Sequence, residues 1–205
     1  MKIIRIIFYL LTGIVLVAGL VCAILFLRQL QPSIPVANAS FSRAKGPFNA
    51  PIQLIEYSDF QCPACRTAQA DLTSLLSLYP GRIRLVYQHF PLDGHRWSRL
   101  AHQAAQCADE QKQFWPYHDR LYQEQSYWSI SMTAPLEFFM RYAKDAGLDL
   151  DRFSACLTDP KIDRKIQEER LTGLGLGVRS TPSFFVNGNL VVSVKTLRDE
   201  IDKIR

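Results

Sequence analysis

Hydrophobic and polar positions divide the chain into an apolar start, a polar spacer and a longer patterned region. Residues 6–27 are mostly Ile, Leu, Val, Phe and Gly and include no charged residue. At ~1.5 Å per helical residue, this run is long enough to span a hydrocarbon core of ~30 Å. We therefore predict one N-terminal transmembrane helix within residues 1–28. Residues 29–47 contain three prolines and no sustained apolar period, which predicts an exposed linker.

The same apolar run could instead be a cleaved signal peptide, because residues 37–39, Ala-Asn-Ala, resemble a small-residue cleavage site. However, the run is longer than the ~7–15 residues of a signal sequence's apolar core and ends well before that tripeptide. We therefore favour an uncleaved signal anchor. Lys2 and Arg5 precede the span and favour a cytoplasmic N-terminus. The following domain is then expected on the periplasmic or extracellular face, where conditions are oxidising and disulfides persist.

The region from residue 48 onward begins with a pattern typical of a strand, a helix and a second strand. Residues 52–57 form one short apolar run, and residues 83–87 form another. Between them, apolar residues recur at helical spacing from Pro63 until Pro80-Gly81 stops the pattern. This order predicts a βαβ unit with two parallel strands.

A long block of amphipathic helical segments follows, over about residues 96–174. Interruptions are expected near Pro116, Pro135, Gly147 and Pro160. The block is rich in aromatic residues, and we expect them to fill a core of its own rather than to bind a ligand.

The pattern then returns to strands. Asn187-Gly188 stands between the apolar runs 183–186 and 190–192, which is a strong signal for a β-hairpin. Residues 195–205 are expected to form a final helix. The domain over residues 48–205 is therefore predicted to be α/β, with a helical domain inserted between a βαβ half and a ββα half.

The formal net charge of +5 first suggests a basic protein. The first 47 residues hold five Lys and Arg residues and no Asp or Glu, so the remaining chain holds 19 basic and 19 acidic residues. A nucleic-acid surface needs its cations clustered on the folded domain. We therefore expect no nucleic-acid partner.

Cys62 and Cys65 stand three positions apart, between the first predicted strand and the first predicted helix. Pro63 suits the first turn of a helix, because its missing N–H would be unpaired there anyway. Cys62 is thus placed at the helix N-terminus, where the helix dipole and free N–H groups stabilise a thiolate and lower the thiol pKa. Cys65 lies one turn further in, near enough to pair with Cys62 and more buried, which suits a resolving thiol.

Other interpretations of the pair stay open at this point. The two thiols could form a zinc site with Cys107 and Cys156, although that second pair lacks ligand-like spacing. They could bind copper together with a histidine, form a structural disulfide, or be buried free thiols. A disulfide closing so small a loop adds little stability, and Cys-X-X-Cys at a strand-to-helix junction is typical of thioredoxin-like redox centres. We favour disulfide exchange without a metal or cofactor, and we expect structural or surface roles for the histidines: His89, His95, His102 and His118.

Five segments, in order, carry a family resemblance over essentially residues 48–205. They are EYSDFQCPAC, QHFPL, AAQCADEQKQFWPYHDRLY, GLDLDRFSACL and GLGVRSTPSFFVNG. Together they resemble the DsbA-like thiol-disulfide oxidoreductases, in particular membrane-anchored or secreted members in which a helical domain is inserted into a thioredoxin fold.

This resemblance implies roles for five residues. Cys62 would form a mixed disulfide with the substrate, and Cys65 would resolve it. Thr181-Pro182 matches the family's cis-proline loop, whose backbone faces the redox pair and binds an extended substrate segment. Glu56 would take or return the Cys65 proton, because burial in a strand raises a carboxyl pKa. The alternative for Glu56 is a solvated or ion-paired carboxylate at the strand end.

Cys107 and Cys156 each share a helical face with apolar residues, so both are expected to point into the helical core. Two buried thiols in an oxidising compartment can pair, or they can remain free. Related family members often carry a second disulfide in the inserted domain, and on that resemblance we favour a structural disulfide.

The function we expect is disulfide formation in exported, cysteine-containing proteins, followed by reoxidation by a membrane or small-molecule redox partner. Pro63 and Ala64 supply no side-chain donor to the Cys62 thiolate, whereas the most oxidising members resemble a chain with His at position 64. A reductase or isomerase role therefore stays open. A copper-binding, thioredoxin-like chaperone without enzymatic activity is the alternative from a different class.

Overall fold

The computed structural model describes residues 13–24 and 43–204, which belong to two separate units. Residues 13–24 are helical. The predicted membrane span, residues 6–27, extends beyond this described helix at both ends. Within the two described ranges, no helix has both the length and the apolar composition needed to cross a bilayer.

A five-stranded mixed sheet forms the centre of the folded domain, in the order β1-β3-β2-β4-β5. Strands β2 and β3 are parallel, whereas the other neighbours are antiparallel. Both the predicted βαβ unit and the predicted hairpin are confirmed. Strand bounds are β1 Ala44–Lys45, β2 Ile52–Ser58, β3 Ile83–His89, β4 Ser183–Val186 and β5 Asn189–Val191.

Strand β1 lies inside the stretch that the sequence pattern predicted to be linker. Ala44 pairs with Val86 of β3, and the preceding Arg43 is buried. The Arg43 guanidinium forms ion pairs with Glu169 at 2.6 Å and with Asp109 at 3.4 Å. The folded domain therefore begins before residue 48, and a strand of two residues is too short to show a hydrophobic period.

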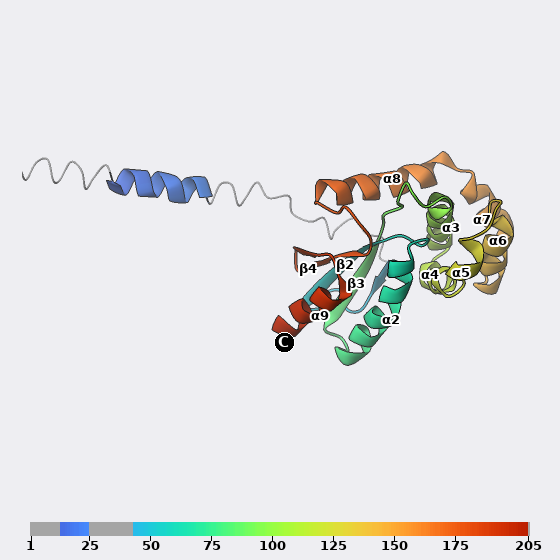
Figure 1. Ribbon diagram of the computed structural model, residues 1–205, viewed down its shortest axis with the longest axis horizontal. Coiled ribbons are helices and arrows are strands. Elements are labelled where there is room, and N and C mark those ends of the chain that lie inside the picture. Colours follow the sequence, from blue (N-terminus) through green and yellow to red (C-terminus); the bar gives the residue numbers. More distant parts are fainter. Residues whose placement is uncertain (1–12, 25–42, 205) are drawn as a thin grey trace, which may run out of the picture. The chain divides into compact units, whose positions relative to one another are not determined.

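Helices cover both faces of the sheet (Figure 1). Helices α2, Pro63–Leu78, and α9, Val194–Lys203, lie side by side on one face, where Leu54 of β2 shares a hydrophobic core with both. Helix α8, Pro160–Gly175, packs against β3. A Cβ atom at Gly173 of α8 would lie 2.8 Å from the Tyr57 ring, so glycine permits this close approach.

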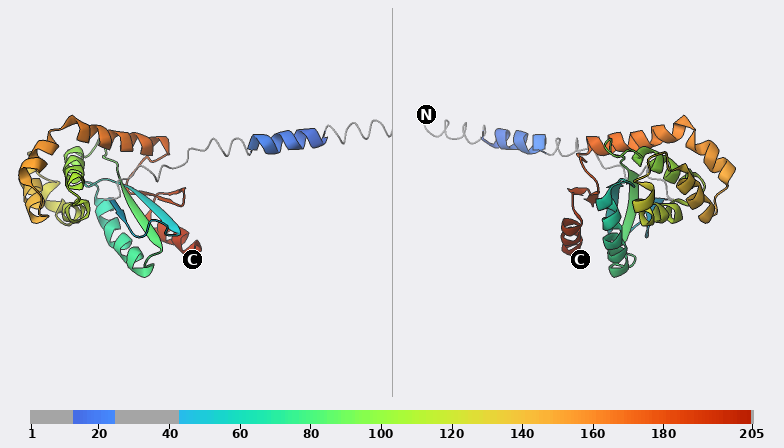
Figure 2. Two further views of the ribbon diagram at one scale, coloured as in Figure 1. Left: turned by 180° about the vertical axis from the view of Figure 1, so that it is seen from behind. Right: turned by 45° about the vertical axis from the view of Figure 1, so that its right-hand side comes forward.

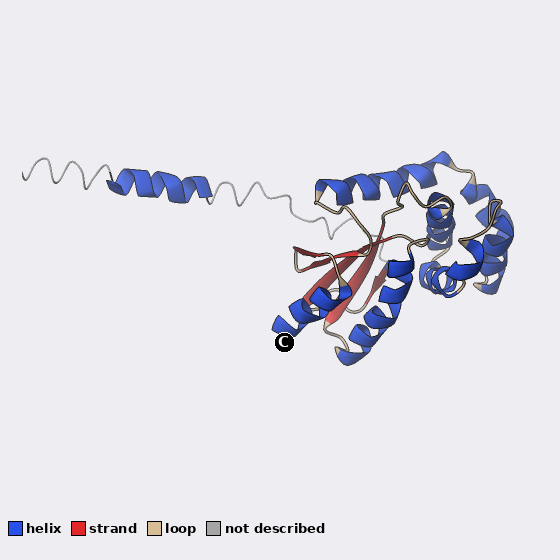
Figure 3. Cartoon of the chain, viewed as in Figure 1, coloured by secondary structure: helices blue, strands red, loops and turns tan. Residues whose placement is uncertain are grey.

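The remaining helices form a block beside the sheet, inserted between β3 and β4 (Figures 2 and 3). Aromatic side chains fill its core as predicted, and Tyr117, Trp128 and Phe153 are fully buried. Pro116 falls in the first turn of α4 instead of interrupting a helix, because α4 begins at Phe114. The bounds are α3 Ser98–Glu110, α4 Phe114–Gln123, α5 Gln125–Trp128, α6 Leu136–Asp145 and α7 Leu150–Leu157.

Candidate active site

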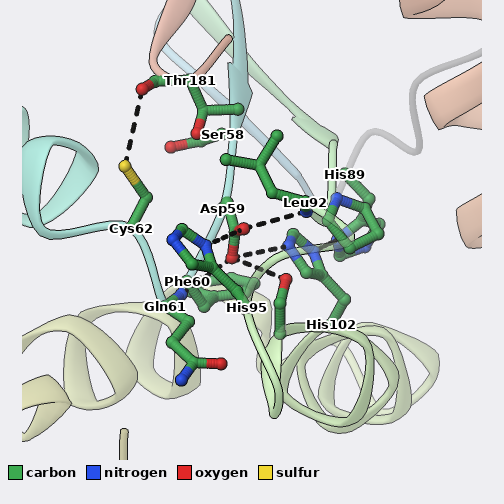
Figure 4. Close-up of polar contacts among 12 residues, drawn as sticks. Ser58, Asp59, Phe60, Gln61, Cys62, His89, Leu92, His95, His102 and Thr181 are labelled. Carbon is green, nitrogen blue, oxygen red and sulfur yellow. Dashed lines mark hydrogen bonds and ion pairs between the residues drawn. The ribbon is translucent and has the colours of Figure 1, made fainter.

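Cys62 lies where the loop after β2 enters α2. It is the N-cap residue of that helix, with Pro63 in the first turn, and its own backbone is extended. The Cys62 Sγ atom lies 3.5 Å from the backbone oxygen of Thr181 (Figure 4). The peptide bond between Thr181 and Pro182 is cis. The fold thus brings Cys62 together with two residues that lie about 120 positions further along the chain.

Cys62 and Cys65 are free thiols with opposite pKa shifts. A hydrogen bond from the Cys65 thiol, opposed by burial and helped by Thr181 and backbone groups of the first helical turn, lowers the pKa of Cys62 to about 5. Burial raises the pKa of Cys65 well above its usual value, and the neighbouring Cys62 thiolate raises it further. At neutral pH the pair therefore holds one thiolate, on Cys62, and one thiol, on Cys65.

Glu56 is fully buried in β2. Desolvation raises the pKa of its carboxyl to about 7, although the Ser58 side chain and a hydrogen bond from Gln69 act in the opposite direction. The Gln69 amide nitrogen donates to Glu56 Oε1 at 2.9 Å. Glu56 Oε2 has no hydrogen-bond partner among the described residues. A buried carboxyl with this pKa can either give or take a proton near neutrality.

Asp59 is a buried carboxylate that the sequence interpretation left without a role. Its oxygens accept hydrogen bonds from the Ser98 hydroxyl at 2.6 Å, the Leu92 amide at 3.0 Å and His95 Nδ1 at 2.7 Å (Figure 4). Burial opposes ionisation, but hydrogen bonds from His102 and His95 hold the pKa of Asp59 below its usual value. Asp59 therefore ties the loop before Cys62 to the segment that leads into α3.

The helical block also contacts this loop directly. The Gln125 amide nitrogen of α5 donates to the backbone oxygens of Phe60, at 2.7 Å, and Cys62, at 2.9 Å. The Tyr122 hydroxyl of α4 lies 2.9 Å from Ser58 Oγ. The sequence pattern predicts neither contact, because Gln125 and Tyr122 each lie more than 60 residues away from the residue that they contact.

The histidines pack mainly among themselves and with aromatic rings. His89 and His102 are buried, and their Nδ1 atoms lie 2.7 Å apart. His118 is buried against Phe60 and Tyr122. In the part of the chain that the structure describes, no group of three or more His, Cys, Asp and Glu side chains could hold a metal ion.

Cys107 of α3 and Cys156 of α7 are joined by a disulfide, with an S–S distance of 2.03 Å. Cys107 is fully buried, whereas Cys156 is only partly buried at the edge of the helical core. The bridge therefore links two helices of the inserted block and lies outside the set of contacts made by Cys62.

Comparison with known proteins assigns the chain to a family. Residues 40–203 match the family model described as Thioredoxin. The chain belongs to the thioredoxin family. It is 30% identical over 171 residues to a Bacillus anthracis protein named "Probable disulfide bond formation protein D", and the match covers 80% of this chain and 78% of that protein. The expected resemblance to DsbA-like thiol-disulfide oxidoreductases is thereby confirmed.

A second group of relatives is much longer than this chain. The chain is 38% identical over 145 residues to "Na(+)/H(+) antiporter NhaA 3" of Salinispora tropica. The match covers 70% of this chain but only 21% of the antiporter. This thioredoxin-like chain thus corresponds to about a fifth of those proteins.

Solved structures share the fold. A thioredoxin-like oxidoreductase from Silicibacter pomeroyi is 28% identical with a TM-score of 0.66, covering 82% of this chain and 92% of that one. Alpha-DsbA1 of Wolbachia pipientis is 23% identical with a TM-score of 0.71, covering 83% and 92%. The predicted thioredoxin-like α/β fold with additional helices is confirmed.

Proposed function

We propose that this protein oxidises pairs of thiols in exported proteins through the Cys62–Cys65 couple. The observation that supports this direction most strongly is the opposite shift of the two thiol pKa values, with Cys62 at about 5. A stabilised thiolate stabilises the reduced form of the couple and is a good leaving group. The disulfide form is then a strong oxidant even though position 64 holds alanine.

The proposed reaction has two exchange steps. A substrate thiolate attacks Cys62 Sγ, which breaks the Cys62–Cys65 bond and forms a mixed disulfide. Cys65 leaves as a thiolate and takes a proton from the carboxyl of Glu56. A second substrate thiolate then attacks the substrate sulfur of the mixed disulfide, and Cys62 leaves as its stabilised thiolate. Two electrons pass from the substrate to the cysteine pair, and a membrane or small-molecule partner removes them.

Thr181 and Pro182 are proposed to bind the substrate. The Thr181 backbone oxygen lies 3.5 Å from the reacting sulfur, so a peptide bonded to Cys62 would run beside this backbone. An extended segment can add to exposed backbone groups in the manner of a β-strand, with little dependence on its sequence. This mode suits an enzyme that acts on many unfolded substrates.

We further propose that the N-terminal segment anchors the domain in a membrane, with the domain on the extracytoplasmic side. The apolar run over residues 6–27 supports this, and so do the exposed side chains of Ile14, Leu16 and Leu20 in the described helix. The full chain should stay in the membrane pellet after an alkaline carbonate wash, whereas Leu16→Lys combined with Leu20→Lys should release it. Release of the unmodified chain would refute the anchor.

The test of the exchange function is oxidation of a reduced, unfolded test protein, with oxidised glutathione as the terminal oxidant. Cys62→Ser should reduce the rate to the uncatalysed background. Cys22→Ser is the matched control, because this exposed cysteine lies in the N-terminal helix, and it should leave the rate unchanged. A wild-type rate for Cys62→Ser would refute the proposal. Reduction of insulin by the wild type that is faster than oxidation of the test protein would favour the reductase alternative.

A further inference from the structure

The Ser58 side chain is buried beside the active site and has no role in the reaction described above. Ser58 ends β2, two residues after Glu56, so both side chains point to the same face of the sheet. Helix α2, which carries Cys65, covers that face. Glu56, Ser58 and Cys65 are all fully buried. Figure 4 shows Ser58 between Thr181 and Asp59, beside the loop that carries Cys62.

Glu56 and Cys65 need an intermediary if they exchange a proton. They share no direct hydrogen bond in the described structure, and Glu56 Oε2 is buried without a partner there. Ser58 follows Glu56 by two residues on the same face of β2, and the amide of the next residue, Asp59, donates to Cys65 Sγ at 3.5 Å. Ser58 also acts to lower the pKa of both groups. Its hydroxyl lies 2.9 Å from the Tyr122 hydroxyl. Ser58 thus lies along β2 between Glu56 and the residue whose amide contacts Cys65.

We propose that the Ser58 hydroxyl passes the proton between Glu56 and Cys65, and that Tyr122 of the helical block is a positioning residue that holds this hydroxyl in place. A serine hydroxyl has one O–H donor and two acceptor lone pairs. When Tyr122 donates to one lone pair, the other can accept from Cys65 while the Ser58 proton points to Glu56 Oε2. In this arrangement the one donor and both acceptor lone pairs of the Ser58 hydroxyl form hydrogen bonds.

The relay rests on the proposed function, because it assumes that Cys65 leaves when a substrate thiolate attacks Cys62. As the Cys62–Cys65 bond breaks, Ser58 gives its proton to the Cys65 thiolate and receives one from the Glu56 carboxyl. The products are a Cys65 thiol and a Glu56 carboxylate, and Ser58 remains a neutral hydroxyl. The reverse transfer accompanies attack by Cys65 on a mixed disulfide, so the relay serves both directions of exchange.

Other titratable groups face this cluster and are left in place by a change at Ser58. Strand β4 presents only the apolar Phe184 opposite Glu56. The groups that act electrostatically on Glu56 or Cys65 come from β1, the start of α2, β3 and α4: Lys45, Cys62, Tyr87 and Tyr122. The backbone amide of Asp59 donates to Cys65 Sγ. A pH profile that changes when only the Ser58 hydroxyl is removed therefore reports on the relay.

The test measures reduction of the Cys62–Cys65 disulfide in the full chain by dithiothreitol, by acid quenching, alkylation and peptide mass spectrometry. After correction for the dithiothreitol thiolate, the wild-type rate should fall as pH rises through about 7, because Glu56 then loses its proton. Ser58→Ala should be about tenfold slower at pH 6, with a flatter profile, since general-acid assistance contributes ~10²–10⁴-fold in full. Ser58→Thr, which keeps the hydroxyl, should restore the rate and the profile.

A second set of variants keeps the proposal testable if Ser58→Ala does not fold. Tyr122→Phe should slow the reaction about threefold. Its matched control is Tyr117→Phe, because Tyr117 is a buried tyrosine of the same helix whose hydroxyl donates to Phe139 instead, and it should leave the rate unchanged.

Two outcomes would overturn the relay. In the first, Ser58→Ala slows the reaction as much in a Glu56→Gln background as in the wild type. Glutamine at position 56 has no carboxyl proton to give, so loss of the relay through Ser58 should have no further effect in that background. The other is equal rates for Tyr122→Phe and Tyr117→Phe. Both differ from failure of the exchange function itself, in which Cys62→Ser would retain full activity.

Discussion

Two pairs of cysteines in one domain differ in almost every physical respect. Cys62 and Cys65 are three positions apart, at the N-terminus of a helix, with a carbonyl oxygen facing the outer sulfur. Cys107 and Cys156 are separated by 49 positions and join two helices of the inserted block. In the first pair the pKa of Cys62 is lowered to about 5 and that of Cys65 is raised well above its usual value, whereas the disulfide-bonded second pair does not titrate. The comparison teaches that position and surroundings, rather than residue type, separate the proposed reactive pair from the disulfide-bonded one.

The largest expected effect concerns the second pair. Replacing both Cys107 and Cys156 by serine should lower the free energy of unfolding by about 4 kcal/mol, because a closed loop of 49 residues restricts the unfolded chain by roughly that amount. Urea unfolding of the two oxidised proteins measures the loss. Exchange activity per folded molecule should stay within about twofold of wild type. A loss of exchange activity in the folded variant would contradict the claim that the Cys107–Cys156 disulfide contributes to stability and not to exchange.

Glu56→Gln should stabilise the protein in a pH-dependent way. Burial raises the folded pKa from 4.5 to about 7, so ionising Glu56 costs free energy in the folded state. This penalty is absent below about pH 4.5, grows as pH rises, and is constant above about pH 7. The substitution should therefore raise the free energy of unfolding by up to about 3 kcal/mol at pH 8 and by little at pH 5.

Chemical unfolding of the reduced protein at both pH values tests this second expectation. The control is Glu137→Gln, an exposed glutamate in the first turn of α6, which should change stability by less than about 0.5 kcal/mol at either pH. Equal stabilisation by Glu56→Gln at pH 5 and pH 8 would mean that the Glu56 carboxyl is not desolvated as described.

The smallest expected effect concerns the pKa of Cys62 in the first pair. Ala64 is exposed beside the Cys62 sulfur, and a histidine there would place an imidazolium near the thiolate. Ala64→His should lower the pKa of Cys62 by up to about one unit, since a nearby opposite charge favours the ionised form. The pH dependence of Cys62 alkylation measures this shift. Ala64→Gln, a neutral chain of similar length, should leave the midpoint near that of wild type.

Local signals predicted much of the fold from the sequence. The hairpin was predictable because its turn needs two residues with positive φ, and Asn187 and Gly188 adopt φ values of 47° and 95°. The place of Cys62 at a helix start was predictable from Pro63. Strand β1 was not, because its two residues carry no period and pair with a strand about 40 positions away.

The active site was predictable only along one stretch of chain. Glu56, Cys62 and Cys65 lie within ten residues, and the family resemblance added Thr181 and Pro182. Asp59 and Ser58 stand in the same stretch, but their partners are supplied by tertiary contacts with the segment after β3 and with α4. No local pattern encodes those contacts. The membrane span extends beyond the described residues and stays a prediction.

The reduction potential of the Cys62–Cys65 couple tests the central claim most directly, because stabilisation of the Cys62 thiolate must appear as stabilisation of the reduced form. Equilibration of the full chain with glutathione buffers, followed by alkylation and mass spectrometry of the Cys62 peptide, measures it. A potential between about −120 and −180 mV is predicted, the range of oxidases and isomerases. A potential near −270 mV, that of a thioredoxin-like reductase, would contradict the account.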